Sequence, residues 1–199
     1  MSAKIANSHS YLRQRIAQIS ARMMVEESID DYYLAKCKAV EQLGIGVRNV
    51  PYPSNSEIEA EILLYQRLFY TEVDLQKLRQ LRQTALKAMH LLRDFNPRLV
   101  GPVLQGTTHR YSEITLHLFA PTAEEVAFFL MEQHIPYELG ERRFRLPEPI
   151  NYPSYQFIAG ETPIVLVVFS TDDIRWSPPS PVDGKPMRRA DARTVEQLL

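Results

Sequence analysis

The spacing of apolar residues changes near Pro97, and this change limits the fold more than any other feature of the 199-residue chain. Before it, apolar residues recur every three or four positions, as on one face of a helix. After it, SEITLHLF at 112–119 alternates apolar and polar residues, as a strand does. The chain is therefore expected to be α+β, with a helical N-terminal half at 1–95 followed by a mixed sheet with helices and a tail at 96–199.

Four helices are expected in the first region. The first carries an apolar stripe around residues 12–23, and the second runs from about Asp30 to Leu43. The third should begin at Ser56, which has the spacing of a capping box with Glu59. The fourth is long, with an apolar side and basic residues elsewhere, and runs from near Thr71 to Phe95.

The second region is expected to contain strands and shorter helices. LVGPVLQ at 99–105 is a short strand candidate, and PTAEEVAFFLMEQH is a helix with Thr122 as its cap. A strand around 135–145 follows, and then a hairpin of YQFIA and IVLVVFS joined by the turn GETP. The proline-rich tail ends in a short helix, and its Arg188 and Arg189 could close over a ligand or simply dock the tail.

The composition limits which classes of partner and which cellular compartment are expected. Lys and Arg number 23 against 24 acids, so there is no strong nucleic-acid signal in the overall charge. No run approaches the roughly 18 to 20 apolar residues of a membrane span, so no membrane partner is expected. The single Cys37 and the absence of a signal-like apolar stretch favour a soluble protein of a reducing, bacterial-type cytoplasm.

Alternation along SEITLHLF separates two sets of side chains onto opposite faces of the expected strand. The apolar set belongs to the core and comprises Ile114, Leu116 and Leu118. The polar set comprises Glu113, Thr115 and His117. These polar side chains lie either in a ligand site or on the wet face of an antiparallel strand.

Upstream of this strand, Gly101 and Gly106 bracket a turn where a backbone could approach a ligand closely. Exposed amide groups there, together with Thr107, could hold a phosphate. The same two glycines also fit an ordinary tight turn.

The stretch GPVLQGTTHRYSEITLHLF at 101–119 resembles the signature of the nucleotidyltransferase superfamily, whose minimal fold occurs in DNA polymerase beta and in antibiotic-modifying adenylyltransferases. That signature is Gly-Ser, a glycine four residues later, and Ser-Asp-x-Asp on the next strand. The positions that match it are Gly101, Val103, Gly106, Ser112, Ile114 and Leu116. The wider chain also resembles a group of uncharacterised proteobacterial proteins labelled nucleotidyltransferase-like, through LVGPVLQGT, ERRFR and SPVDGKPMRR.

This resemblance implies a site in which a serine binds nucleotide phosphate and three Asp on two strands hold two magnesium ions. Two-metal phosphoryl transfer needs such a cluster of anionic oxygens. Here Pro102 replaces the serine, Glu113 and Thr115 replace the first two Asp, and the later strand IVLVVF is wholly apolar. The missing carboxylates count against Mg2+, so we expect nucleotidyl transfer to be impaired or lost, with nucleotide or other phosphate-ligand binding as the remaining role.

The candidate site residues follow from this comparison. Glu113 is the one catalytic and metal-binding candidate. The ligand-binding candidates are Gly101, Gly106, Thr107, Ser112, Thr115, His117, Arg143 and Arg145. The two arginines would share one face of the ERRFR strand and could pair with a phosphate, although basic residues also protect an edge strand from aggregation.

Two alternatives remain open. In the first, the chain is an active transferase in which Glu113 and acids from elsewhere rebuild a metal site. The acids considered for this are Glu138, Glu141 and Glu161. In the second, the helical half is an interaction module that binds a protein partner through the basic and apolar faces of the fourth helix, and the α+β half is its scaffold.

Overall fold

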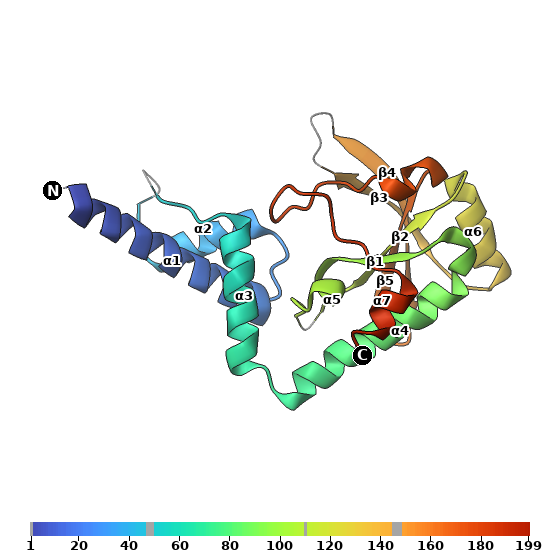
Figure 1. Ribbon diagram of the computed structural model, residues 1–199, viewed down its shortest axis with the longest axis horizontal. Helices are drawn as coiled ribbons and strands as arrows, with labels where there is room; N and C mark the ends of the chain where they lie inside the picture. The colour runs from blue at the N-terminus through green and yellow to red at the C-terminus, as the bar shows by residue number, and fades with distance from the viewer. Residues whose placement is uncertain (1, 47–49, 110, 145–148) are drawn as a thin grey trace. The chain divides into compact units, whose positions relative to one another are not determined.

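A computed structural model describes residues 2–46, 50–109, 111–144 and 149–199 of the chain. The fold is α+β, as expected, with a helical N-terminal half and a mixed sheet of five strands that all lie after it (Figure 1). In order, the elements are α1 (Ser2–Glu26), α2 (Tyr32–Gln42), α3 (Asn55–Phe69), α4 (Glu72–Leu91), η1 (Arg93–Phe95), β1 (Arg98–Val100), α5 (Gly101–Gln105), β2 (Ile114–Phe119), α6 (Ala123–Glu132), β3 (Glu138–Phe144), β4 (Ile150–Ala159), β5 (Thr162–Phe169), η2 (Thr171–Arg175) and α7 (Ala192–Glu196). Among these residues, no helix is both long and apolar enough to cross a membrane.

The chain forms two compact units, which are described separately. The helical unit comprises residues 1–71, 107–111 and 181–183, and the sheet unit comprises the remainder, beginning at Glu72. The first boundary therefore falls at residue 71 rather than near residue 95. The physical reason is that α4 buries its apolar side in the core of the sheet unit and not among the other helices.

In the helical unit, α1 packs against α2 and α3 around buried aliphatic side chains such as Ile16, Ala39 and Ile58. The cap of the third helix lies two residues earlier than expected. Its cap is Ser54, whose hydroxyl accepts from the backbone N–H of Glu57, while the Glu57 carboxylate accepts from the Ser54 backbone. The prediction of a capping box between Ser56 and Glu59 is therefore wrong, because the two reciprocal hydrogen bonds join Ser54 and Glu57 instead.

Two short segments from later in the chain complete the helical unit through polar contacts. The amide of Asn55 donates to the Pro181 carbonyl at 2.6 Å, and Gln66 donates to the Thr108 carbonyl at 3.0 Å. His109 Nε2 lies 2.7 Å from a carboxylate oxygen of Asp30. These contacts explain why segments distant in sequence belong to this unit.

The sheet of the second unit has the strand order β1-β2-β5-β4-β3. Strands β2 and β5 run parallel, and the other neighbouring pairs are antiparallel. The parallel register places Val165 beside Thr115 and Val167 beside His117. Because side chains alternate along a strand, these four residues share one face of the sheet.

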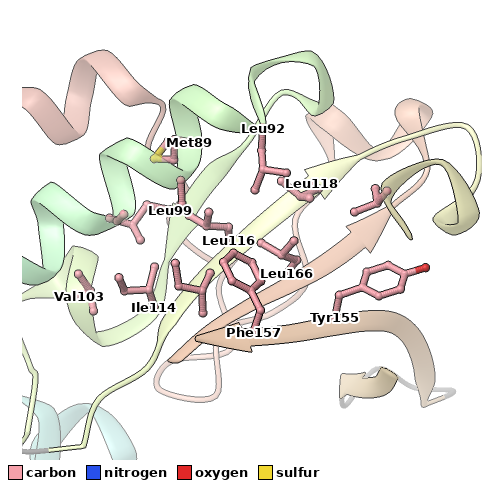
Figure 2. Packing of buried hydrophobic residues seen from close by; sticks show 14 of the residues in the cluster. Met89, Leu92, Leu99, Val103, Ile114, Leu116, Leu118, Tyr155, Phe157 and Leu166 are labelled. Carbon is pink, nitrogen blue, oxygen red and sulfur yellow. The ribbon is translucent and has the colours of Figure 1, made fainter. Parts of the chain in front are cut away.

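The opposite face of the sheet holds the main core, shown in Figure 2. Leu99, Leu116 and Leu166 from three neighbouring strands lie in it with Met89 of α4 and Val103 of α5. Helices α6 and α7 add further apolar side chains to the same cluster. Helices α4, α5, α6 and α7 thus all pack on this face. In α4 the buried residues are Leu81, Ala85, Ala88 and Met89, whereas Val73 and Leu75 near its start are exposed.

The face that carries Thr115 and His117 has its own, smaller cluster. It consists of Phe119, Val165, Val167 and Phe169, and Phe144 and Tyr152 pack against it. This cluster lies over β2 and β5, where the family resemblance would place catalytic carboxylates. The face is therefore aromatic and aliphatic at its centre.

Two local expectations in this unit differ from the structure. Residues 101–105 form the short helix α5 rather than a strand, because Gly101 takes a φ of +73° and Pro102 fits the first helical turn. Thr122 occupies the cap position of α6, as expected, but its side chain makes no capping hydrogen bond.

Candidate functional site

The polar residues of β2 are buried rather than solvent-facing. Thr115 is 8% exposed and His117 is 1% exposed. The wet-face interpretation of this strand is therefore wrong for these two residues. The aromatic cluster and the C-terminal tail cover this part of the sheet. The alternation of residues within β2 could not predict this burial, because the covering residues lie elsewhere in the sequence.

His117 is buried by contact with Arg189 of the tail. Arg189 Nε donates to His117 Nδ1 at 3.0 Å, and the imidazole packs 4.6 Å from the Phe169 ring. Burial, together with the positive charges of Arg189 and Arg142, lowers the pKa of His117 to about 3. His117 is thus a neutral hydrogen-bond acceptor that positions the tail.

Arg189 in turn is held by the sheet unit on several sides. Its guanidinium carbon lies 4.8 Å from the centroid of the Phe119 ring and 4.9 Å from that of Phe169. Nη1 donates to the carbonyls of Asp173 and Trp176. Burial lowers the pKa of Arg189 to about 10, which leaves it charged at neutral pH. The prediction that this part of the tail docks on the rest of the protein is confirmed for Arg189.

Glu113 lies just before β2, at the edge of a polar trough of about 180 Å³. Its Oε1 accepts from Thr115 Oγ1 at 3.5 Å and lies 3.4 Å from Nη2 of Arg142, with which it forms an ion pair. The trough is also lined by Glu138, Gly140, Glu141, Ser154, Gln156 and Val165. It therefore combines acidic, basic and amide groups of β3 and β4 with Val165 of β5 and with Glu113.

The three acids considered as substitutes for the missing carboxylates are not gathered around Glu113. Glu138 and Glu141 both belong to the lining of the trough, but the Glu141 carboxylate accepts from Asn151 Nδ2 at 2.8 Å, on the side of β3 opposite to Glu138 by alternation. Glu161 lies in the turn between β4 and β5 and is not among the residues that line the trough. Within the described part of the chain, no group of three or more His, Cys, Asp or Glu side chains is arranged to hold a metal.

The two glycines flank a helix rather than an open loop. Gly101 is the first residue of α5, and Gly106 caps its C-terminus with a φ of +82° and donates its backbone N–H to the Pro102 carbonyl. Arg82 of α4 donates to the Val103 carbonyl at 3.2 Å. It also donates to the Leu198 carbonyl at 2.9 Å. The turn at Gly106 therefore lies next to Arg82, whose guanidinium donates to backbone carbonyls.

The remaining candidates are dispersed. Ser112 is 7% exposed and belongs to the sheet unit, whereas Thr107 belongs to the helical unit. Arg143 pairs in register with Asn151 and is exposed on the side of β3 opposite to Arg142. Arg145 lies outside the described residues. The structure therefore groups Glu113, Thr115 and His117 on one face and leaves Arg143 on the other.

Arg142, Ser154 and Gln156 belong to the trough but were not candidates from the sequence. The ERRFR stretch signalled a basic strand, yet which arginine faces β2 depends on the register of β3 against β4, where Arg142 pairs with Tyr152. Ser154 and Gln156 alternate with buried aromatic residues in β4, a pattern shared by any half-buried strand. That Ser154 and Gln156 line the trough can be learned only from the order of the strands in the sheet.

Comparisons of the chain with known protein families, with curated proteins and with solved structures find no match. Functional inference therefore depends on the residues and geometry described above.

Proposed function

We propose that this protein is nucleotidyltransferase-like, has lost metal-dependent nucleotidyl transfer, and binds a phosphate-bearing ligand such as a nucleotide in the trough beside Glu113. The observation that carries the proposal is the ion pair between Glu113 and Arg142, 3.4 Å apart. The single carboxylate at the position of the family's first Asp is paired with a cation of the protein itself.

The donor set supports the loss of two-metal chemistry. Where the resembled family has three carboxylates, this chain has the Glu113 carboxylate, the Thr115 hydroxyl and, beside it on β5, the alkyl group of Val165. Magnesium ions prefer anionic oxygens, and two ions held about 4 Å apart need several of them to offset their mutual repulsion. These residues do not fit a pair of magnesium ions.

Arg142 supports binding of a phosphate group without a metal. Its guanidinium has five N–H donors, of which only part is used by one Glu113 oxygen. The trough volume of about 180 Å³ is below the range of roughly 300 to 1,000 Å³ typical of sites that enclose a whole small molecule. A bound nucleotide would therefore place one phosphate in the trough and leave the remainder in solvent.

Calorimetry with the four ribonucleoside triphosphates, each with and without magnesium, tests this function. We expect weak binding of similar affinity in both conditions and no turnover of labelled triphosphate. A protein that binds only with magnesium would contradict the loss of metal dependence. A labelled product that disappears in Glu113→Gln would instead establish the active transferase, and no heat with any triphosphate would remove the binding part.

A second candidate function is protein binding by the helical unit. The observation that favours it is a groove of about 370 Å³ between α1 and α3. Its apolar residues include Leu64, Leu68 and Phe69, which are 47%, 66% and 63% exposed. Such a groove is suited to the apolar face of a partner helix.

This surface differs from the fourth helix, through which a partner is expected to bind on the basis of the sequence. A photo-crosslinking amino acid at Leu68 tests it, with the same residue at Leu63 as the matched control. Leu63 is on the same helix and 47% exposed, but it does not line the groove. We expect a crosslinked partner from Leu68 and not from Leu63, whereas equal yields would contradict binding in the groove.

We also propose that the protein works in the cytoplasm. The support for this is compositional: the one cysteine, Cys37, is free in the structure. Fractionation of expressing cells followed by immunodetection would check it, and recovery in the periplasmic or membrane fraction would contradict it.

A further inference from the structure

The α1/α3 groove has a basic border on the α1 side. Arg15 and Arg22 both line it, seven residues apart in the same helix, which corresponds to two turns and about 10.5 Å along the axis. Neither arginine is strongly paired. Arg15 donates to Gln18 at 3.4 Å, and Arg22 lies 3.9 Å from Glu26 in an exposed ion pair. The groove thus offers an apolar floor with two cations along its α1 edge, and one acid, Glu61 of α3, also lines it.

The exposed side of α6 has the complementary chemistry. Phe128 and Met131 are 63% and 61% exposed. Glu125 and Glu132 are also exposed and are seven residues apart, so their carboxylates repeat at the same spacing of about 10.5 Å. With Glu124, these side chains occupy an arc of about 120° at 3.6 residues per turn.

We propose that the α1/α3 groove binds α6 of a second copy of this chain. Phe128 and Met131 pack onto the floor at Leu64 and Leu68, and Glu125 and Glu132 pair with Arg15 and Arg22. The complementarity of charge and of spacing selects this occupant over an unrelated helix. The inference rests on the second candidate function above, protein binding by the helical unit, and names the partner.

The contact joins two different surfaces, so it is head-to-tail. Each copy has one groove and one α6, and such a contact produces either a closed ring or an open chain. Because α6 has 10 residues and extends about 15 Å, the buried area is below that of stable dimers. Association is therefore weak, increases with protein concentration and decreases with salt, which screens exposed ion pairs.

Light scattering of the full-length protein across concentration tests the proposal. We expect the mass to rise above the 23.0 kDa of one chain as concentration increases, and to fall again in 0.5 M salt. A charge-swap pair gives the sharper test. One variant carries Arg15→Glu and Arg22→Glu, and the other carries Glu125→Arg and Glu132→Arg.

Each charge-swap variant alone should remain monomeric, because its altered surface meets a like-charged wild-type surface. An equimolar mixture of the two should recover wild-type association, since reversed groove matches reversed helix and the unaltered surfaces still match each other. All substitutions are at exposed positions, so circular dichroism should show both variants folded. A monomeric wild-type protein at millimolar concentration, association unchanged by either variant, or no recovery on mixing would overturn the proposal. A groove-specific crosslink at Leu68 to a different protein would then retain protein binding as a function while excluding this partner.

Discussion

Arg142 and Glu113 face one another across the trough, with 3.4 Å between Nη2 and Oε1, so a protein cation occupies the neighbourhood of the only motif carboxylate. The substitution Glu113→Gln should release Arg142 for a phosphate group and remove a repelling charge. Exposed pairs of this kind contribute up to about 1 kcal/mol, so we expect triphosphate affinity to rise roughly two- to fivefold. Calorimetry measures this effect. Glu141→Gln is the matched control, because the Glu141 carboxylate bonds Asn151 instead, and a loss of affinity in Glu113→Gln would contradict the prediction.

Burial of neutral His117 should make stability depend on pH. Its pKa is about 3 in the folded chain and about 6.5 when unfolded, so between these values the unfolded state binds the extra proton. The contribution of neutral His117 to the free energy of unfolding is therefore fully present above pH 6.5 and is lost as the pH falls toward 3. The contribution at pH 5 should be about 2 kcal/mol lower than at pH 7.5.

Denaturant unfolding at a series of pH values checks this prediction. His117→Gln retains an acceptor for Arg189 but does not titrate, so its stability should decline less between pH 7.5 and 5 than that of the wild-type protein. Parallel curves for the two proteins would contradict the assignment, even if the variant is less stable overall.

The capping box at the start of α3 gives a direct stability prediction. Ser54→Ala removes the acceptor for the Glu57 N–H and should cost about 1 kcal/mol. Ser10→Ala, at an exposed position within α1, should change stability by no more than about 0.5 kcal/mol. Thermal or denaturant unfolding of the two variants would test this, and equal losses would argue against the cap.

Gly106 should be difficult to replace for conformational reasons. Its φ is +82°, and Gly106→Ala should cost about 1 to 2 kcal/mol because a side chain disfavours this backbone geometry. The Cβ itself fits, since its nearest neighbours would be Arg82 Nη2 at 3.7 Å and Leu78 Cδ2 at 3.8 Å. Gly46 lacks a positive φ, so Gly46→Ala is the control and should be close to neutral. Similar losses in both variants would contradict this explanation.

Much of the secondary structure could be predicted because local periodicity is physical information present in each segment. The strands at 114–119 and 162–169 and the four long helices at the N-terminus follow from repeated apolar spacing. The α5 segment misled the prediction, because apolar residues around Gly101 and Pro102 fit a short strand as well as one helical turn. Which serine caps α3 could not be settled by spacing alone, since Ser54 and Ser56 each precede a glutamate by three residues.

The candidate site was predicted less well, because it depends on contacts between distant parts of the chain. His117 was recognised from its strand position, but its burial is due to Arg189, 72 residues later. The trough depends on the order of β2, β5, β4 and β3, and the register of β3 against β4 places Arg142 rather than Arg143 on the side of Glu113. Likewise, the assignment of α4 to the sheet unit depends on which surface covers its apolar side, and periodicity does not specify that surface.

The helical unit is built from three stretches of chain, the last of which is Pro181–Asp183. On a ribosome, which adds residues from the N-terminus onward, α1, α2 and α3 leave the exit tunnel long before the carbonyl that Asn55 requires has been synthesised. The N-terminal helices must therefore wait until residues 181–183 have been synthesised before they acquire all the neighbours they have in this unit. A truncation anywhere before residue 181 would deprive both units of part of their structure at once.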